Sequence, residues 1–123
     1  MRVMVIVKAS ADSEAGTMPS AELLEAMEDF NRQLIAAGIM VTGDGLKPSS
    51  QGKRIHFDGT ARTVSDGPFA QTNELVAGFW LWQVRDMDEA MEWAQRCPNP
   101  MPGPSDLAVS YTHLRAHETG RNL

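Results

Sequence analysis

The sequence predicts one α+β domain in which two helices pack on a largely antiparallel sheet, with elements in the order β-α-β-hairpin-β-α-β. Its 123 residues are the size of a single domain, and 42% hydrophobic with 22% charged residues is ordinary globular composition. Two segments have the apolar spacing of amphipathic helices. Short β-branched or alternating runs lie before, between and after them, and these predict the strands.

The first strand and the first helix have clear signals. The opening run "MRVMVIVK" is short, β-branched and nearly continuously apolar, which indicates a strand buried on both faces. The polar stretch that follows contains Gly16 and Pro19 and predicts a loop. Ser20 is a candidate N-cap, and Gly38 is placed to end the helix as its C′ residue. The apolar stripe of this helix is formed by Leu23, Met27, Phe30 and Leu34, and is widened by Leu24 and Ile35.

The middle of the chain predicts a short strand, a hairpin and a long strand. The short strand after Gly38 is broken by the sequence Gly43-Asp44-Gly45. Asp58-Gly59 is a two-residue turn signal for the hairpin. A loop made of these two residues would set Ile55 opposite Arg62, a poor pair, so the register stays open. The segment "ELVAGFWLWQV" then predicts a long strand.

The second helix and the last strand complete the order. Asp86 is a candidate N-cap, with Glu89 three residues later in a capping-box arrangement. The buried stripe of this helix is Met87, Met91, Ala94 and Cys97, before Pro98 stops it. A loop with four prolines and the alternating run "DLAVSYTHL" follow. Two helices and a mainly antiparallel sheet in this order predict a ferredoxin-like βαββαβ domain with an extra hairpin.

Charge and cysteine content narrow the function classes. The formal net charge of −5, without a basic stripe, argues against a nucleic-acid partner. The single cysteine, Cys97, excludes an internal disulfide and is typical of a reducing cytosol. The apolar runs are too short for a signal-peptide core or a membrane span. We therefore expect a cytoplasmic protein, and no motif points to a cofactor or a metal.

The long strand is apolar on both faces. Period-two alternation places Trp80 and Trp82 on one face and Phe79 and Leu81 on the other. A ferredoxin-like sheet has helices on one face only, so something else must cover the second face. We expect a second copy of the chain to cover the Trp80/Trp82 face and form a dimeric αβ barrel. The alternative is a monomer whose loops or tail cover that face.

The turn Asp66-Gly67-Pro68-Phe69 has a sufficient local explanation, because Asp, Gly and Pro each favour turn geometry. The run "DGPFAQTNELVAGFWLWQV" also resembles the signature of the YCII-related, or DGPF-domain, family. The likeness extends to "MRVMVIVKA", "MPSAELLEAM", "AAGIMVTGDGLKPSS" and "MEWAQRCPNPMPG", and covers about residues 1–105. It implies a dimeric αβ barrel over residues 1–110, and it hints at regulation because some members are associated with sigma factors.

Two features depart from the family pattern. Better-studied relatives place a proposed catalytic His in the first helix, and the best-matching position here is Met27, which weakens a claim of general base catalysis. Residues 111–123 lack the acidic tail that the family implies, and we interpret them as a non-family and non-native tail. His113 and His117 have an i, i+4 spacing that suits zinc, but they lie in this tail without a suitable third ligand.

Candidate site residues gather at predicted strand ends. We expect Lys8, Asp44, Asp66 and Glu74 to meet at one end of the barrel. In a catalytic version Asp66 or Glu74 acts as base and Lys8 as electrostatic stabiliser. The aromatic wall of the ligand site would be formed by Phe69, Trp80 and Trp82. The competing interpretation is a Lys8–Glu74 ion pair, with both aspartates serving only their turns.

The remaining titratable side chains have simpler explanations: we expect His56 to be solvated on the hairpin and Cys97 to be a core residue. Three functional hypotheses follow. The first is a binding or regulatory accessory protein for a small polar ligand. The second is a small enzyme of the isomerase, lyase or hydrolase kind, and the third is a purely structural self-associating domain.

Overall fold

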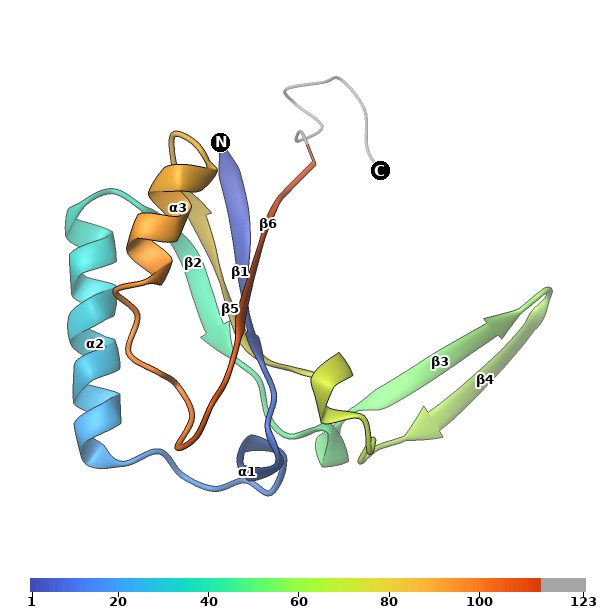
Figure 1. Ribbon diagram of the computed structural model, residues 1–123. Helices are drawn as coiled ribbons and strands as arrows, with labels where there is room; N and C mark the ends of the chain where they lie inside the picture. The colour runs from blue at the N-terminus through green and yellow to red at the C-terminus, as the bar shows by residue number, and fades with distance from the viewer. Residues whose placement is uncertain (114–123) are drawn as a thin grey trace.

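A computed structural model describes residues 1–113 of the chain (Figure 1). In chain order, its elements are β1 (Arg2–Lys8), α1 (Ala11–Glu14), α2 (Ala21–Ala36), β2 (Met40–Gly45), η1 (Ser49–Gln51), β3 (Lys53–Asp58), β4 (Ala61–Asp66), η2 (Thr72–Glu74), β5 (Val76–Gln83), α3 (Met87–Ala94) and β6 (Leu107–Tyr111). The main sheet is antiparallel with strand order β2-β5-β1-β6, and β3 and β4 form a separate hairpin. This confirms the predicted ferredoxin-like order.

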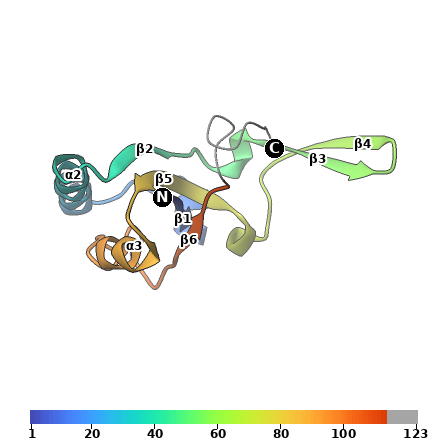
Figure 2. The same ribbon diagram turned by 90° about the horizontal axis from the view of Figure 1, so that it is seen from above.

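Helices α2 and α3 lie on the same side of the main sheet (Figure 2). The face that they cover is the tryptophan face: Val3 lies opposite Trp82, Val5 lies opposite Trp80, and all four side chains are buried. The ring centroid of Phe30 on α2 is 5.9 Å from that of Trp80 and 6.3 Å from that of Trp82. The hydrophobic core therefore lies between these two strands and the helices.

The expectation that a second copy covers the Trp80/Trp82 face is wrong, because the chain's own helices cover it. Trp82 is fully buried and Trp80 is 6% exposed within one chain. The error has a physical cause: both faces of β1 and β5 are apolar, so alternation alone does not say which face the helices choose. The helix-free face is instead formed by the other row of side chains. Along β1 and β5 its apolar members are Met4, Ile6, Phe79 and Leu81, which are half-buried.

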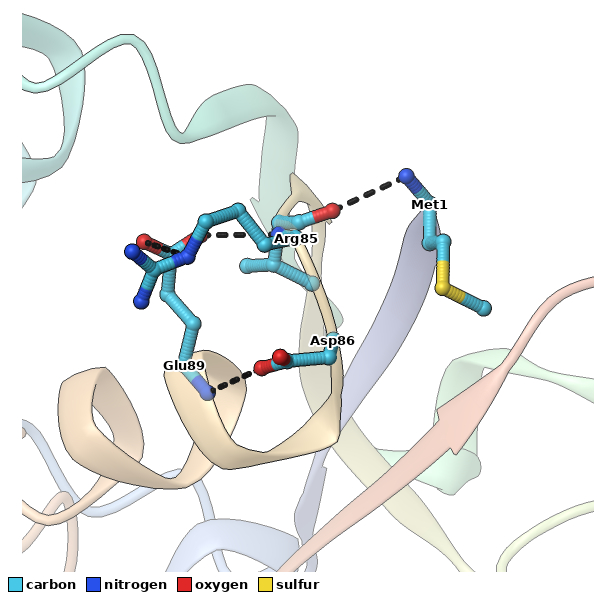
Figure 3. Close-up of polar contacts among 5 residues, drawn as sticks. Met1, Arg85, Asp86 and Glu89 are labelled. Carbon is cyan, nitrogen blue, oxygen red and sulfur yellow. Dashed lines mark hydrogen bonds and ion pairs between the residues drawn. The ribbon is translucent and has the colours of Figure 1, made fainter.

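The predicted starts of both long helices are confirmed. Ser20 Oγ accepts a hydrogen bond from the Leu23 backbone N–H at 3.1 Å. Asp86 Oδ1 accepts from the Glu89 N–H at 2.9 Å, while Glu89 Oε1 accepts from the Arg85 N–H at 2.8 Å (Figure 3). Beside them, the amino group of Met1 donates to the Val84 carbonyl, which ties the start of β1 to the end of β5.

Helix α2 ends as expected, with Gly38 at a φ of 73°. Its stripe is narrower than predicted, because Leu24 is 47% and Ile35 63% exposed. Helix α3 ends at Ala94, so Cys97 lies beyond it rather than in its last turn. Both helices therefore use fewer apolar positions than their sequence pattern offers.

Three local expectations are corrected by backbone hydrogen bonding. Strand β2 is not broken at Gly43 but runs to Gly45, because β5 pairs along its whole length. The predicted loop after β1 contains the one-turn helix α1, because Ser10 and Ser13 form a reciprocal capping box. Strand β5 begins at Val76, after the 3-10 turn η2.

The β3–β4 hairpin projects away from the main sheet in both views (Figures 1 and 2). Asp58 pairs with Ala61, so the two-residue loop is Gly59-Thr60, one position later than the turn signal suggests. This register sets Ile55 opposite Val64, a better pair than Arg62. The apolar residues Ile55, Phe57 and Val64 are 53%, 64% and 59% exposed, respectively. A two-stranded hairpin with such exposure has little support from its own chain.

The last strand uses residues on both sides of the expected domain boundary at residue 110. Tyr111 pairs with Val3, and its hydroxyl oxygen accepts a hydrogen bond from the Met87 N–H at 2.9 Å. The interpretation of a foreign tail, and the His113/His117 pair, fall mainly on residues 114–123, outside the described residues. Between residues 1 and 113, no helix is both long and apolar enough to span a membrane.

Candidate functional site

A cavity of about 970 Å³ opens between α2 and one end of the sheet. Two connections that converge at this end complete its wall: the β1–α2 connection and the α3–β6 connection (Figure 1). The volume lies near the upper end of the range of about 300–1,000 Å³ that is usual for small-molecule sites. Most of the wall is apolar, with residues that include Leu23, Met27, Met40, Trp80 and Met101.

The polar part of the wall is small and carries negative charge only. Its charged residues are Asp12 in α1 and Asp44 in β2, and the Asp44 side chain lies on the helix-free face because Asp44 pairs with Phe79. In the described part of the chain, the wall contains no Lys, Arg or His. The uncharged polar side chains of the wall are Ser13, Thr17, Ser20, Asn31 and Asn99. The arrangement suits a largely apolar ligand that makes a few directed hydrogen bonds.

Trp80 and Asn31 form the most defined polar contact in the wall. The indole Nε1–H of Trp80 donates a hydrogen bond of 2.9 Å to Asn31 Oδ1 on α2. The bond joins the sheet to the helix and satisfies an indole nitrogen that is otherwise buried with its ring. Gly43 in the neighbouring strand leaves the space for this indole, because a Cβ there would lie 2.6 Å from Trp80 Cδ1.

Short polar contacts hold the two connections in place. The Ser10 hydroxyl, which also caps α1, lies 3.2 Å from Met101 Sδ and donates to it across the cavity end. The Glu14 carboxylate accepts hydrogen bonds from the Ser49 backbone N–H at 2.8 Å and from the Ser49 hydroxyl. Residues that are distant in sequence are thereby fixed around one opening.

The cavity wall contains two of the residues that the sequence singles out, Asp44 and Trp80. Trp82 lies instead in the core between the sheet and the helices, outside the wall. Its Nε1 is buried and has no hydrogen-bond partner within residues 1–113. The two tryptophans of β5 therefore differ, since only Trp80 lines the cavity and has its donor satisfied.

The DGPF turn packs against η1 and lies outside the cavity wall. The Asp66 carboxylate forms an ion pair of 2.5 Å with Lys53, and both side chains are at least 70% exposed. The Phe69 N–H donates to Ser49 Oγ at 3.0 Å, and the Arg54 guanidinium lies 4.0 Å from the centroid of the Phe69 ring. A Cβ on Gly67 would lie 1.7 Å from the Ser49 carbonyl oxygen. The turn thus has a structural role that explains its glycine.

Lys8 and Glu74 lie close along the backbone but do not form the expected ion pair. The Ala9 N–H donates to the Leu75 carbonyl at 3.0 Å, which brings the residues next to them together. Among the described residues, the ion pairs do not include Lys8 or Glu74, and neither residue lines the cavity. Lys8 alternates with Val7 and shares the side of β1 that carries Met4 and Ile6, away from the tryptophans.

Cys97 and His56 have the simple environments that the sequence suggests. Burial raises the pKa of the Cys97 thiol to about 11 and keeps it in its unreactive protonated form near neutral pH. His56 is exposed on β3, opposite Thr63. Neither residue lines the cavity.

Sequence reasoning missed Asn31 and Asp12, which both line the cavity. Asn31 lies four residues after Met27, so it is on the apolar side of α2 and interrupts the stripe. A polar residue at such a position is the signal that could have found it. Asp12 offers no comparable signal, because it belongs to a polar segment whose fold depends on the Ser10 cap.

Comparisons with known proteins agree with this architecture. The profile of the YCII-related domain matches residues 1–110. An uncharacterised protein of Rhizobium meliloti (strain 1021) is 30% identical over 87 residues, which are 71% of this chain and 70% of that protein. The fold is similar to that of 5-chloro-2-hydroxyhydroquinone dehydrochlorinase (TftG) from Burkholderia phenoliruptrix AC1100, solved in complex with 2,5-dihydroxybenzoquinone. That likeness has a TM-score of 0.55 at 13% identity, over 96% of this chain and 99% of the other. The chain therefore belongs to the YCII-related domain family.

Proposed function

We propose that the protein binds a small, largely apolar molecule in the cavity between α2 and the sheet. The observation that carries this proposal is the cavity itself: about 970 Å³ of space, mainly apolar walls and a few fixed polar groups. For scale, an engineered apolar cavity of about 150 Å³ is enough to hold benzene. A space of this size is a plausible container for a ring with substituents.

Two further observations support a ligand at this place. Met27 lines the cavity, and it is the position that best matches the first-helix His of better-studied relatives. TftG, whose fold is similar, was solved with a small ring compound bound. The likeness is one of fold, so it supports small-molecule binding and leaves the identity of this chain's ligand to experiment.

A thermal-shift screen of small ring compounds tests the proposal, with Leu23→Trp and Leu24→Trp as a matched pair. Leu23 lines the cavity, whereas the adjacent Leu24 is 47% exposed and outside the wall. A ligand at 100 times its dissociation constant should stabilise wild type by about 2.7 kcal/mol. We expect this shift to persist in Leu24→Trp and to fall clearly in Leu23→Trp, whose added ring occupies part of the cavity. Equal shifts in both variants would place the ligand elsewhere.

A second candidate function is an enzyme in which a cavity carboxylate acts as general base. Asp12 favours it, because it lines the cavity from α1, and TftG shows that this fold can carry an enzyme. The test is turnover of any compound found to bind, measured with wild type and Asp12→Asn. Lost turnover with retained binding would support the enzyme, whereas binding without turnover in wild type would favour the binding protein.

We also propose that a second copy packs on the helix-free face of the sheet. Met4, Ile6, Phe79 and Leu81 form an apolar row there, on the side of the sheet opposite the helices. The projecting hairpin adds exposed apolar side chains that a partner would cover. Light scattering after gel filtration should give a dimer mass for wild type and a monomer mass for Ile6→Glu. Trp fluorescence must show that the variant is folded, and a folded wild-type monomer would contradict the proposal.

A further inference from the structure

The two ends of the Asn31 amide have different environments. Its Oδ1 accepts the hydrogen bond from Trp80 Nε1 at 2.9 Å. An indole N–H is a donor only, so the oxygen of the amide must occupy this end. The amide nitrogen, with its two N–H donors, is the end that remains for the cavity, which Asn31 lines. The contact with Trp80 thus determines which kind of hydrogen bond Asn31 offers to a ligand.

Among residues 1–113, no other group accepts a hydrogen bond from these donors. Within residues 1–113, the hydrogen bonds of the Asn31 side chain involve its oxygen alone, although the residue is half-buried. Met27, one turn earlier on α2, and Trp80 supply apolar wall on either side. A donor fixed in an apolar wall is the feature that orients a ligand in a small-molecule site.

The charge of the wall restricts the ligand further. Among the described residues, Asp12 is the charged residue that lines the cavity from the helix side, since the Asp44 side chain shares the other face of the sheet with Phe79, and the described wall offers no cation to offset an anionic ligand. An anion would lose hydration and meet a charge of its own sign. An uncharged carbonyl compound avoids both costs and accepts the hydrogen bond from Asn31 Nδ2.

We propose that Asn31 is a specificity-determining residue that selects uncharged, mainly apolar carbonyl compounds, with Trp80 as the residue that positions its amide. This inference rests on the proposed function and names the ligand class of the same cavity.

Three probes of similar size separate the contribution of the hydrogen bond from those of apolar contact and of ligand charge. Acetophenone has a ring and an uncharged carbonyl, ethylbenzene has the same body without an acceptor, and benzoate replaces the ketone by an anion. Affinities are measured by titration on ¹H–¹⁵N NMR spectra, with the indole N–H resonance of Trp80 as the reporter beside the cavity. We expect wild type to bind acetophenone about threefold to tenfold more tightly than ethylbenzene, the usual net effect of one hydrogen bond. Benzoate should bind most weakly.

The decisive variant is Asn31→Asp. It keeps an oxygen to accept from Trp80, so the fold is supported, but it replaces the donor that faces the cavity by a second oxygen. We expect the preference for acetophenone over ethylbenzene to disappear. Gln51→Glu makes the same chemical change at an exposed residue outside the wall and should retain the preference.

Trp80→Phe tests the positioning role, and its titrations are followed on the backbone amide resonances of Met27 and Gly43, because the variant lacks the indole reporter. Without the indole donor the Asn31 amide is free to turn, so the ratio of the two affinities should fall. If Trp80 has a purely structural role, the substitution should weaken the binding of both probes by the same factor and leave the ratio of affinities unchanged. That result would overturn the positioning role.

The outcomes distinguish this inference from the proposed function beneath it. If neither acetophenone nor ethylbenzene binds wild type, the binding function fails and the selectivity fails with it. If both bind equally well, or if Asn31→Asp keeps the preference, the role of Asn31 is overturned while the cavity stands as a binding site. Benzoate binding as tight as that of acetophenone would overturn the selection of uncharged compounds.

Discussion

Gly43 and Trp80 are in close contact across β2 and β5: a Cβ on Gly43 would lie 2.6 Å from Trp80 Cδ1, closer than real Cβ atoms come. The Trp80 ring thus occupies the space that a larger residue would need. The same ring packs near Phe30 and donates to Asn31. The lack of a side chain at Gly43 therefore allows Trp80 to take its place in the cavity wall and to contact Asn31.

Gly43→Ala should displace the Trp80 indole and destabilise the fold. Overpacking of this kind costs about 1–3 kcal/mol in the free energy of unfolding. Chemical denaturation measures the cost, and the Trp80 indole N–H resonance should move. The control is Gly45→Ala in the same strand, where a Cβ would meet nothing within 4 Å. Equal stability of the two variants would contradict the close contact.

Trp80→Phe should cost more stability than Trp82→Phe. Both changes remove the same atoms from the core, but Trp80 loses a hydrogen bond whereas the Trp82 Nε1 is buried without a partner in the described residues. The difference should be about 1.5–4.5 kcal/mol, because the lost hydrogen bond contributes about 0.5–1.5 kcal/mol and the relief of the unsatisfied donor about 1–3 kcal/mol. Urea unfolding of the two variants measures it. A larger loss of stability for Trp82→Phe would show that the buried Trp82 nitrogen does not destabilise the fold.

Gly67→Ala should loosen the base of the hairpin without affecting the cavity. A Cβ there would lie 1.7 Å from the Ser49 carbonyl oxygen, so the backbone must shift. We expect faster amide hydrogen exchange at Phe69 and along β3 and β4, with unchanged ligand affinity. Gly103→Ala, where the Cβ would be in open space, is the control. A loss of ligand affinity in Gly67→Ala would show that the DGPF turn contributes to the binding site.

Cys97 should react slowly with alkylating agents in the folded protein. Burial raises the pKa of its thiol from 9.0 to about 11. At pH 8 the thiolate fraction, and with it the rate of iodoacetamide labelling, should be about 100-fold lower than in urea-unfolded protein. Rapid labelling of the native protein at pH 8 would contradict the burial of this thiol.

The same shift has a consequence for stability at high pH. The folded pKa lies above the unfolded value, so the folded state holds the proton more tightly between them. The contribution of the thiol to stability is complete below about pH 9 and is lost as the pH rises toward 11. Cys97→Ala, compared with wild type over this range, should show a smaller fall in stability.

The sequence predicted local features better than tertiary ones. The Ser20 and Asp86 caps, the C′ role of Gly38 and the order of the strands are correct because each depends on a few neighbouring residues. The hairpin register stayed open, and the structure places its loop one residue later than the turn signal because this register pairs Ile55 with Val64 rather than with Arg62. Turn chemistry and cross-strand pairing compete there, and the pairing decides.

The candidate site was predicted less well, for a different reason. Strands β1 and β5 are apolar on both faces, so the covered face follows from how the helices pack and not from alternation. Asp44 and Trp80 were singled out and line the cavity, whereas Lys8, Asp66 and Glu74 do not. Asn31 gains its significance only from the contact with Trp80, 49 residues away in the chain. Contacts of that range are not encoded in any local pattern.

The most direct test of the binding site is a calorimetric titration of acetophenone into wild type, Leu24→Trp and Leu23→Trp. A site between α2 and the sheet predicts saturable binding of one molecule per chain to the first two proteins and much weaker binding to the third, whose added ring occupies part of the cavity. Undiminished binding to Leu23→Trp, with all three proteins equally folded, would show that the cavity is not where the ligand is held.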